Sequence, residues 1–229
     1  MATVKGAATT RAERARQTRR RMLDSAGELF LRDGYAETTM DRIADRAGVA
    51  VQTLYYTFRS KGQLLCELVE VTAAGDEEVA PVAQRAWVGE MLTATSGQRV
   101  IALAVEHGAD IFVRAAPLWP AVAAAASDPH VDRYWAGVTA GRRAGQARMV
   151  ARLDELGALR PGLDPDRATD VVVTLFGHEA FTSLVTRAHW SVPEYKAWLL
   201  TTLAQQLLQR PRLAPRAYAD LSYSAQVTR

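Results

Sequence analysis

Apolar residues recur at helical spacing along almost the whole of this 229-residue chain, and no other feature constrains its fold as strongly. Spacing of i, i+3, i+4 and i+7 places apolar side chains on one face of a helix, whereas a half-buried strand requires strict alternation. No alternating run bounded by an Asn-Gly or Asp-Gly turn occurs. The nine prolines stand between the periodic segments, where helices begin or end. The sequence therefore predicts an all-α protein.

The N-terminal third of the chain predicts three helices in close succession. The first covers about residues 13–33. The second is short, is capped by Thr38 or by Thr39, and ends at Gly48. Its apolar stripe consists of Met40, Ile43, Ala44 and Ala47. The third begins about three residues after the glycine and lasts until about Phe58. Two short helices joined by a tight turn with glycine are typical of a helix-turn-helix unit.

The remaining two-thirds predict a larger helical body. Ser60 and Gln63 have the spacing of a capping box at the start of a fourth helix, which extends to about residues 75–78. Further helices are expected over about 81–94, 97–115, 118–126, 129–156, 166–188 and 193–209. We expect four regions, which are a disordered basic arm over 1–12, a helix-turn-helix DNA-binding domain over 13–60, an effector-binding and dimerisation domain over 61–210, and a mobile tail over 211–229.

Positive charge is concentrated near the N-terminus. Residues 1–62 carry twelve Lys/Arg and seven Asp/Glu, a net charge of +5, although the net charge of the whole chain is +3. A basic region on a slightly acidic body indicates a surface that faces nucleic acid, although a solvated basic tail gives the same totals. The single cysteine, Cys66, excludes a disulfide framework and lies in an apolar run as a core residue. No secretion signal and no stretch of 18 apolar residues occurs, so we expect a cytoplasmic protein without a membrane span.

A specific combination of short motifs runs through YAETTMDRIADRAGVAVQTLYYTFRSKGQLL, residues 35–65. The motifs are Gly34-Tyr35, Thr38-Thr39, Ala47-Gly48-Val49, Leu54-Tyr55-Tyr56-Thr57-Phe58 and Ser60-Lys61. With this combination, about residues 16–68 resemble the TetR family of bacterial transcriptional repressors. The resemblance implies a homodimer that binds a palindromic operator in double-stranded DNA, is released by a small lipophilic effector and needs no cofactor.

The same resemblance places the third helix, about residues 51–58, in the major groove of DNA, although this helix carries no charged side chain. Amides, hydroxyls and apolar groups can read base edges while cations elsewhere bind phosphates. Gln52 is expected to pair with a base such as adenine, and Val51 and Tyr56 to contact thymine methyl groups. The groups expected on phosphates are the hydroxyls of Thr39, Thr53, Tyr55 and Thr57 and the ammonium of Lys61.

Two further expectations concern the surroundings of this helix. Leu54 and Phe58, spaced i, i+4, are expected to point inward and hold it on the first two helices. Arg19 and Arg20 are candidates either for a backbone contact or for a solvated face. The chain also departs from the family pattern. Many members have Ser-Lys-Gly where this chain has Ala50-Val51-Gln52, and a histidine is common at the position of Thr57. Some members carry a base-reading arginine at the position of Met40. These departures leave the operator sequence open.

The helical body supplies candidates for two further sites that the resemblance implies. The candidates for an effector pocket are Trp87, Met91, His107, Phe112, Trp119, Trp135, Phe176 and His178, with Glu106, Asp110 and Glu179 as further polar groups. The candidates for a dimer interface are Val172, Phe176, Ala180, Trp198, Leu199, Thr202, Leu203 and Gln206. In both cases the alternative is that these side chains only fill the core of their own chain.

Other classes of function have less support in the sequence. The four histidines are scattered, and the chain contains no H-E-x-x-H, no G-x-S-x-G and no glycine-rich phosphate loop, so we expect neither an enzyme nor a metal site. An effector-independent architectural DNA binder remains an alternative, as does a transcriptional activator, because the sign of regulation depends on the position of the operator.

Overall fold

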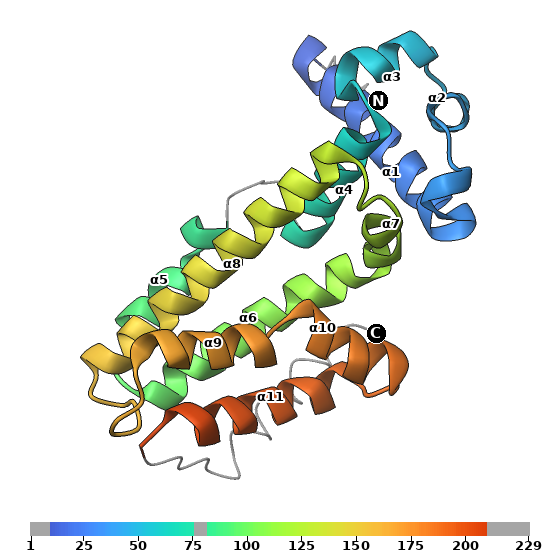
Figure 1. The fold of residues 1–229 in the computed structure, drawn as a ribbon. Helices are drawn as coiled ribbons and strands as arrows, with labels where there is room; N and C mark the ends of the chain where they lie inside the picture. The colour runs from blue at the N-terminus through green and yellow to red at the C-terminus, as the bar shows by residue number, and fades with distance from the viewer. Residues whose placement is uncertain (1–9, 76–81, 210–229) are drawn as a thin grey trace, which may run out of the picture. The chain divides into compact units, whose positions relative to one another are not determined.

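In a computed structural model of the protein, residues 10–75 and 82–209 are described. This part of the chain is all-α, as predicted (Figure 1). Within it no strand forms, and the single β-type pairing is an isolated antiparallel bridge between Leu159 and Leu208. The predicted basic arm up to residue 9 and the predicted tail from residue 210 lie outside the described residues.

The helices follow the predicted order. Their bounds are α1 Arg11–Glu37, α2 Met40–Ala47, α3 Val51–Phe58, α4 Lys61–Ala74, α5 Ala86–Thr93, α6 Gly97–Ala115, α7 Trp119–Ala124, α8 Pro129–Glu155, α9 Pro165–Leu175, α10 His178–Phe181 and α11 Val192–Leu207. Short 3-10 turns lie at Val82–Gln84 and Ala116–Leu118, and a π-helical turn lies at Thr182–Arg187.

The chain divides into two compact units, and their division differs from the predicted boundary at residue 60. The first unit contains residues 10–72 and 117–135, and the second contains the other described residues. The reason is that Leu64, Leu65 and Leu68 of α4 pack in the same core as α1, α2 and α3. Helix α7 completes this core. Cys66 is buried there, as predicted, and burial raises the pKa of its thiol to about 11.

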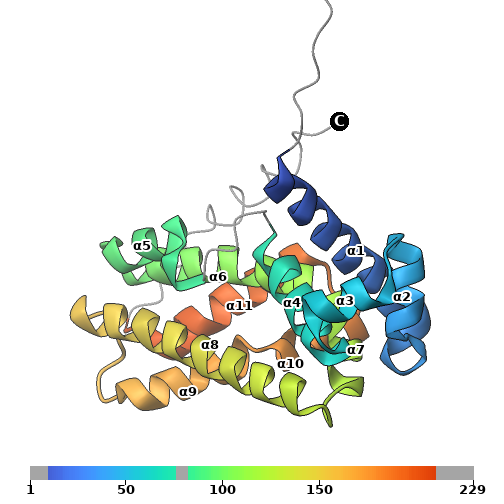
Figure 2. The same cartoon turned by 90° about the horizontal axis from the view of Figure 1, so that it is seen from above.

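Packing in the first unit follows from the apolar stripes of its short helices. Met40, Ile43, Ala44 and Ala47 of α2 are all buried, as their spacing predicted. Helix α1 packs against α2 and α7, and α2 packs against α3 (Figure 2). Leu54 and Phe58 of α3 are completely buried, which confirms that they point inward.

Local capping explains where these helices begin and end. Helix α1 starts earlier than predicted because Thr10 and Glu13 form a capping box. Its regular course is interrupted at Gly34, whose φ of 81° is a left-handed conformation that favours glycine. Of the two proposed caps of α2, Thr39 is the actual one, since its side chain accepts a hydrogen bond from the Arg42 N–H. The Thr38 hydroxyl is instead buried and donates to the Gly34 carbonyl at 2.8 Å.

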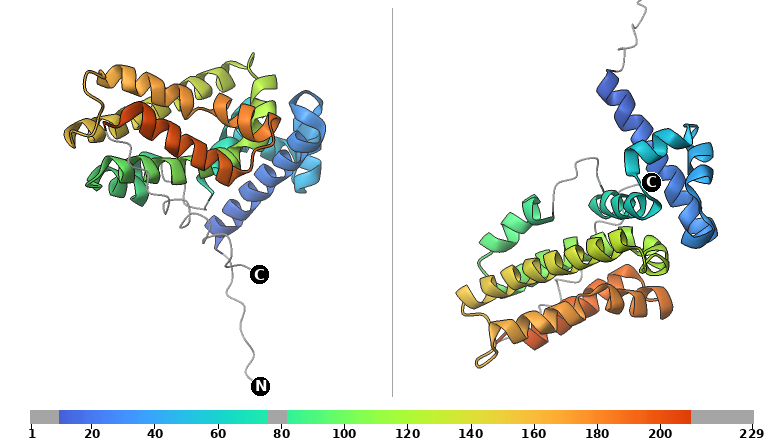
Figure 3. Two further views of the ribbon diagram at one scale, coloured as in Figure 1. Left: turned by 90° about the horizontal axis from the view of Figure 1, so that it is seen from below. Right: turned by 45° about the horizontal axis from the view of Figure 1, so that its top comes forward.

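The second unit is built on α5, α6, α9, α11 and most of α8. Helix α6 packs against α5 and α11, and α11 also packs against α9 (Figure 3). The predicted helix over 166–188 is wrong as one continuous element, since Phe176 and Gly177 have non-helical backbone angles and separate α9 from α10. The backbone is extended at Gly177, with φ −117° and ψ 165°, so the helical path ends there, and the capping box of Ser191 and Glu194 later starts α11 as predicted.

Candidate nucleic-acid interface

The turn between α2 and α3 fixes the direction of α3. Gly48 ends α2 in a left-handed conformation with φ 65° and ψ 41°. The Val49 N–H then donates to the Ala44 carbonyl at 3.0 Å, which satisfies an end carbonyl of α2. A side chain at position 48 would be strained in this conformation. Helix α3 therefore leaves the turn in one defined direction, with Ala50 as a cap that makes no side-chain hydrogen bond.

The outward face of α3 is formed by the side chains that were predicted to meet DNA. Gln52, Thr53 and Tyr55 are exposed, and Tyr56 is 91% exposed. Gln52 and Tyr56 lie one helical turn apart and so share a face. Val51 is only half-exposed, because it packs against the core of the first unit. An almost fully exposed tyrosine on a helix whose inner face is completely buried is typical of a contact surface.

Two of the predicted phosphate-binding hydroxyls already have partners in the chain. The Thr57 hydroxyl donates to the Thr53 carbonyl at 2.8 Å, so its proton is directed into the helix. The Thr39 hydroxyl oxygen accepts the Arg42 N–H at 3.3 Å, but its own proton has no acceptor among the described residues. Thr39 therefore remains able to donate to a phosphate oxygen, whereas Thr57 in this conformation does not.

Lys61 has a different environment from the one predicted. Its ammonium donates to the carbonyls of Tyr35 at 2.7 Å and Thr38 at 2.8 Å, and lies 4.1 Å from the centroid of the Tyr35 ring. Burial lowers the pKa of Lys61, and the charge of Glu37 opposes this change. Tyr35 lies in the last turn of α1 and Thr38 is its C-cap, and the last carbonyls of a helix have no donor within it, so Lys61 braces the start of α4 against the α1–α2 corner.

This bracing role can be separated from a phosphate contact by replacing Lys61 with methionine. Lys61→Met keeps the length of the side chain but leaves two carbonyls without a donor, so we expect the free energy of unfolding to fall by about 1–3 kcal/mol. A urea titration measures this loss. We expect the slope of log K against log salt for DNA binding to stay unchanged, and a slope smaller by about 0.9 would instead assign Lys61 to a phosphate.

Most arginines near α3 hold carboxylates of their own unit. Arg42 pairs with Asp33, and Arg46 with Glu28. Hydrogen bonds from Arg32 and Arg42 lower the pKa of Asp33 to about 2. The two arginines that the sequence singled out are likewise paired, Arg19 with Glu67 and Arg20 with Asp24. These pairs are largely exposed, so each contributes little stability.

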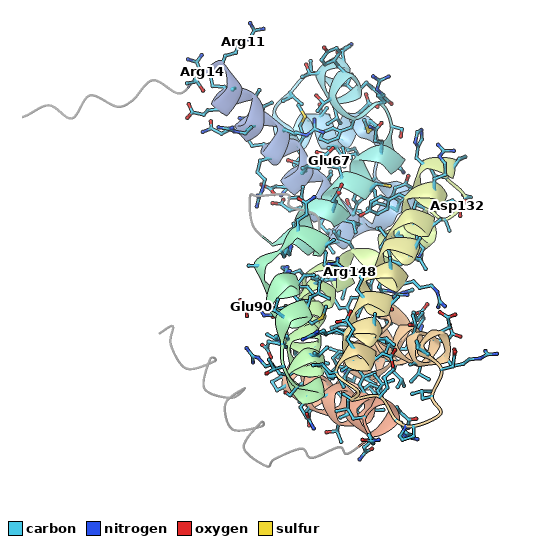
Figure 4. The ribbon with its side chains drawn as sticks, turned by 90° about the vertical axis from the view of Figure 1, so that its left-hand side faces the viewer. Arg11, Arg14, Glu67, Glu90, Asp132 and Arg148 are labelled. Carbon is cyan, nitrogen blue, oxygen red and sulfur yellow. The ribbon has the colours of Figure 1, made fainter. Side chains whose placement is uncertain are left out.

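One cation beside α3 was missed by the sequence analysis. Arg59 directly follows α3, is exposed and adopts a positive φ of 60°. It makes no ion pair with any described residue. At the N-terminal end of α1, the side chains of Arg11 and Arg14 extend away from the helix (Figure 4). These residues place positive charge in the unit that contains the uncharged α3, and the signal for Arg59 in the sequence was its position at the end of the motif.

The candidate pocket residues do not all belong to one unit. Trp119 and Trp135 lie in the first unit, where Trp135 packs against the core, so their assignment to a pocket of the larger body needs correction. In the second unit, the Trp87 ring stacks on His107 with centroids 5.3 Å apart, and Met91 is buried. Glu106 and Asp110 both pair with Lys196, at 2.9 and 2.7 Å, so these carboxylates are already engaged.

The predicted dimer interface also needs correction for half of its residues. The four side chains already buried within a single chain are Val172, Phe176, Leu199 and Leu203. They face α6 and its neighbours rather than a partner. On α11, Leu199 and Leu203 are four residues apart and form the face that packs inside the unit. The four that keep some exposure are Ala180, Trp198, Thr202 and Gln206.

Comparison with known proteins identifies the N-terminal segment. Residues 22–68 match the family model described as bacterial regulatory proteins, tetR family. TtgW of Pseudomonas putida, described as an uncharacterized HTH-type transcriptional regulator, is 39% identical over 54 residues, which are 24% of this chain and 40% of that protein. The aligned part is therefore less than two thirds of this relative, and the likeness in sequence concerns the DNA-binding segment.

Solved structures extend the likeness in fold to most of the chain. NalD of Pseudomonas aeruginosa, the secondary repressor of the MexAB-OprM multidrug efflux pump, has a TM-score of 0.66 at 19% identity and covers 86% of this chain and 98% of its own. SmeT, the repressor of the Stenotrophomonas maltophilia multidrug efflux pump SmeDEF, in its complex with triclosan, has a TM-score of 0.66 at 18% identity and covers 87% and 95%. At these identities the likeness shows the fold alone.

Two further properties of the described part bear on function. None of its helices combines the length and apolarity needed to span a bilayer. Across residues 10–75 and 82–209, no three side chains of His, Cys, Asp or Glu are grouped so that they could hold a metal ion.

Proposed function

Because this chain is a helix-turn-helix protein of the TetR family, we propose that it is a ligand-responsive transcriptional repressor that binds a palindromic operator as a homodimer. One observation carries the proposal. Gln52 and Tyr56 project from a short helix whose inner residues, Leu54 and Phe58, are completely buried. A rigidly seated helix with exposed amide and aromatic groups is suited to the major groove.

We assign base reading and phosphate binding to different residues. The Gln52 amide pairs with a base edge, and the Tyr56 ring packs on a thymine methyl group, with Val51 at the edge of the contact. Thr39 and Arg59 bind phosphates on either side of α3, together with Thr53 and Tyr55. Specificity then comes from the neutral helix, while the salt-dependent part of the affinity comes from its flanks.

Dimerisation sets the distance between the two copies of α3. We propose that the exposed side of the α10–α11 region, with Ala180, Trp198, Thr202 and Gln206, meets the same region of a second chain. Two copies of α3 about 34–36 Å apart would enter successive major grooves of a palindrome. The two half-sites of the operator are then related by the symmetry of the dimer.

Release from DNA requires an effector that favours a different conformation. We propose that a small lipophilic molecule binds in the second unit among Phe112, Phe176 and His178, with Trp87, Met91 and His107 as further candidates. The triclosan complex of SmeT supports this class of ligand for the fold. The effector can shift the equilibrium only by its difference in affinity for the two conformations. We assign the transmission of this conformational change to helix α4, because the helix begins in the first unit and ends in the second.

Selection of bound sequences from random duplex DNA tests the proposal. The full chain is used at two salt concentrations, and we expect enrichment of one palindrome with half-sites about one helical turn apart. Sedimentation of the complex is expected to give two chains per palindrome. Recovery of unselective binding that weakens steeply with salt would reject the proposed repressor and indicate an architectural DNA binder.

A further inference from the structure

Three of the buried polar atoms without a hydrogen-bond partner in the second unit lie close together. They are Nε of Arg142, Oε1 of Gln146 and the hydroxyl oxygen of Tyr195. Gln146 is 8% exposed and Tyr195 is 0% exposed, so bulk water does not satisfy these groups. A buried polar group without a partner is unfavourable, and native proteins keep very few of them. Three such atoms close together therefore indicate that something outside the chain completes their hydrogen bonding.

The residues that carry these atoms gather at the break between α9 and α10. Gln146 donates through Nε2 to the Phe176 carbonyl at 3.0 Å, and this bond leaves Oε1 as the unsatisfied atom. A Cβ on Gly177 would lie 3.6 Å from Nη1 of Arg142. Burial lowers the pKa of His178, Glu179 opposes this change, and Arg142 adds to it. The charge of Arg142 also reaches Tyr195, where it opposes the rise in pKa that burial causes.

The backbone at Gly177 is closely surrounded by other atoms. The same Cβ on Gly177 would lie 3.0 Å from the Val173 carbonyl oxygen and 2.9 Å from Oε2 of Glu179. A larger residue would therefore crowd the backbone where the guanidinium approaches it. After α10 the chain forms a π-helical turn, Thr182–Arg187, and such irregular turns are frequent at functional sites.

Apolar rings lie next to this polar group. The Phe112 ring meets Phe176 and Phe181 edge to face, with centroids 5.6 and 5.9 Å apart. Phe181 in turn meets the Tyr195 ring at 5.1 Å. The buried polar atoms thus adjoin a cluster of aromatic rings, an arrangement that suits a molecule with one polar end and one apolar end.

The charged side chains around the break determine which kind of polar group a ligand needs there. Arg142 forms no ion pair with any described residue, and Glu179, the carboxylate nearest to the break, lies 3.2 Å from Nδ1 of His178 and is largely exposed. The guanidinium therefore lacks a buried counter-charge. The carboxylates that could receive a cation, Glu106 and Asp110, are instead paired with Lys196. Arg142 is half-buried with its Nε fully buried, and a cation held partly out of water without a partner is unfavourable unless an anion joins it.

We propose that the effector is an amphipathic organic acid whose carboxylate binds Arg142 and the Tyr195 hydroxyl. Its apolar part packs on Phe112, Phe176 and Phe181, and Gln146 accepts a hydrogen bond from a hydroxyl or N–H group of the same molecule. Guanidinium and phenol groups both donate to a carboxylate, and Gln146 Oε1 can only accept. This inference rests on the proposed effector site and adds the chemical class of its ligand.

Calorimetry with matched probes tests the sign of the charge. The full chain is titrated with phenylalkanoates and alkanoates of increasing length, and with the alcohol and the amine of each same chain. We expect at least one acid to bind roughly 10- to 100-fold more tightly than its alcohol and its amine. Arg142→Gln is expected to abolish this preference. The control Arg148→Gln removes an exposed positive charge from the same helix and is expected to keep it (Figure 4).

Tyr195→Phe separates a ligand-binding role from a structural one. The substitution keeps the ring contacts with Phe181 and Trp198 but removes the unsatisfied hydroxyl. We expect the Tm without ligand to stay the same or rise, while the affinity for the preferred acid falls roughly 3- to 10-fold. A lower Tm with unchanged affinity would mean that the hydroxyl is satisfied within the folded protein, and the proposal would fail.

The outcomes distinguish this inference from the proposed function. Binding to the selected palindrome is measured first, without any probe. A chain that binds no palindrome contradicts the repressor assignment, whatever its ligands. A chain that binds the palindrome but shows no acid that exceeds its matched alcohol and amine overturns only the inference about the effector. Release of the palindrome by the preferred acid, lost in Arg142→Gln, would support both.

Discussion

Phe58→Ala is expected to unfold the first unit under conditions in which the unchanged protein is folded. The Phe58 ring is 0% exposed, belongs to the core that joins α1 to α4, and lies 4.7 Å from the Arg19 guanidinium. Removing a buried phenylalanine costs about 3–5 kcal/mol, and the whole stability of a domain is only about 5–15 kcal/mol. Urea unfolding followed by circular dichroism measures the loss.

Tyr56→Ala is the matched control, since it removes an aromatic ring from the same helix. Tyr56 is 91% exposed, so we expect the free energy of unfolding to change by less than about 0.5 kcal/mol. Equal losses for Phe58→Ala and Tyr56→Ala would contradict the orientation of α3 described above.

Tyr56→Ala and Gln52→Ala are expected to produce the largest losses in operator binding. Each removes a side chain that we propose contacts a base edge, and since such a contact is worth about 1–3 kcal/mol, affinity for the selected palindrome should fall by roughly 5- to 150-fold. Affinity for unrelated DNA should change little, because neither side chain carries charge. Fluorescence anisotropy with labelled duplexes, at several salt concentrations, measures both affinities.

Arg59→Gln is the contrasting variant for the same experiment. It removes a cation beside α3, so binding to every sequence should weaken by a similar factor, and the salt slope should fall by about 0.9. If Gln52→Ala instead weakened all sequences equally, the assignment of base reading to α3 would be wrong.

The parts of the fold that the sequence predicted are those governed by local rules. The buried stripe of α2, its end at Gly48 and the start of α11 at Ser191 depend on residues within one or two helical turns. The buried face of α3 was predicted in the same way, since Leu54 and Phe58 are four residues apart and both are buried. Local spacing was sufficient at each of these places.

The errors arose where distant parts of the chain meet. Lys61 finds its acceptors on backbone carbonyls more than twenty residues away, and nothing in its own motif marks them. At the break, a Cβ on Gly177 would lie 3.6 Å from Nη1 of Arg142, a residue of another helix that the local pattern does not mark. Leu199 and Val172 are apolar at helical spacing, but the pattern does not say whether the apolar face meets its own chain or a second copy.

Under the proposed function, the paired arginines of the first unit affect how the protein distributes between its operator and the rest of the chromosome. Arg19, Arg20, Arg42 and Arg46 each hold a carboxylate, so a phosphate must displace that partner before it gains the full attraction. Random DNA offers about 10⁶–10⁹ competing sites, and weak binding to each of them removes protein from the operator. Arginines that are already paired with carboxylates weaken binding to random DNA. Fewer copies of the protein are then needed to keep the operator occupied.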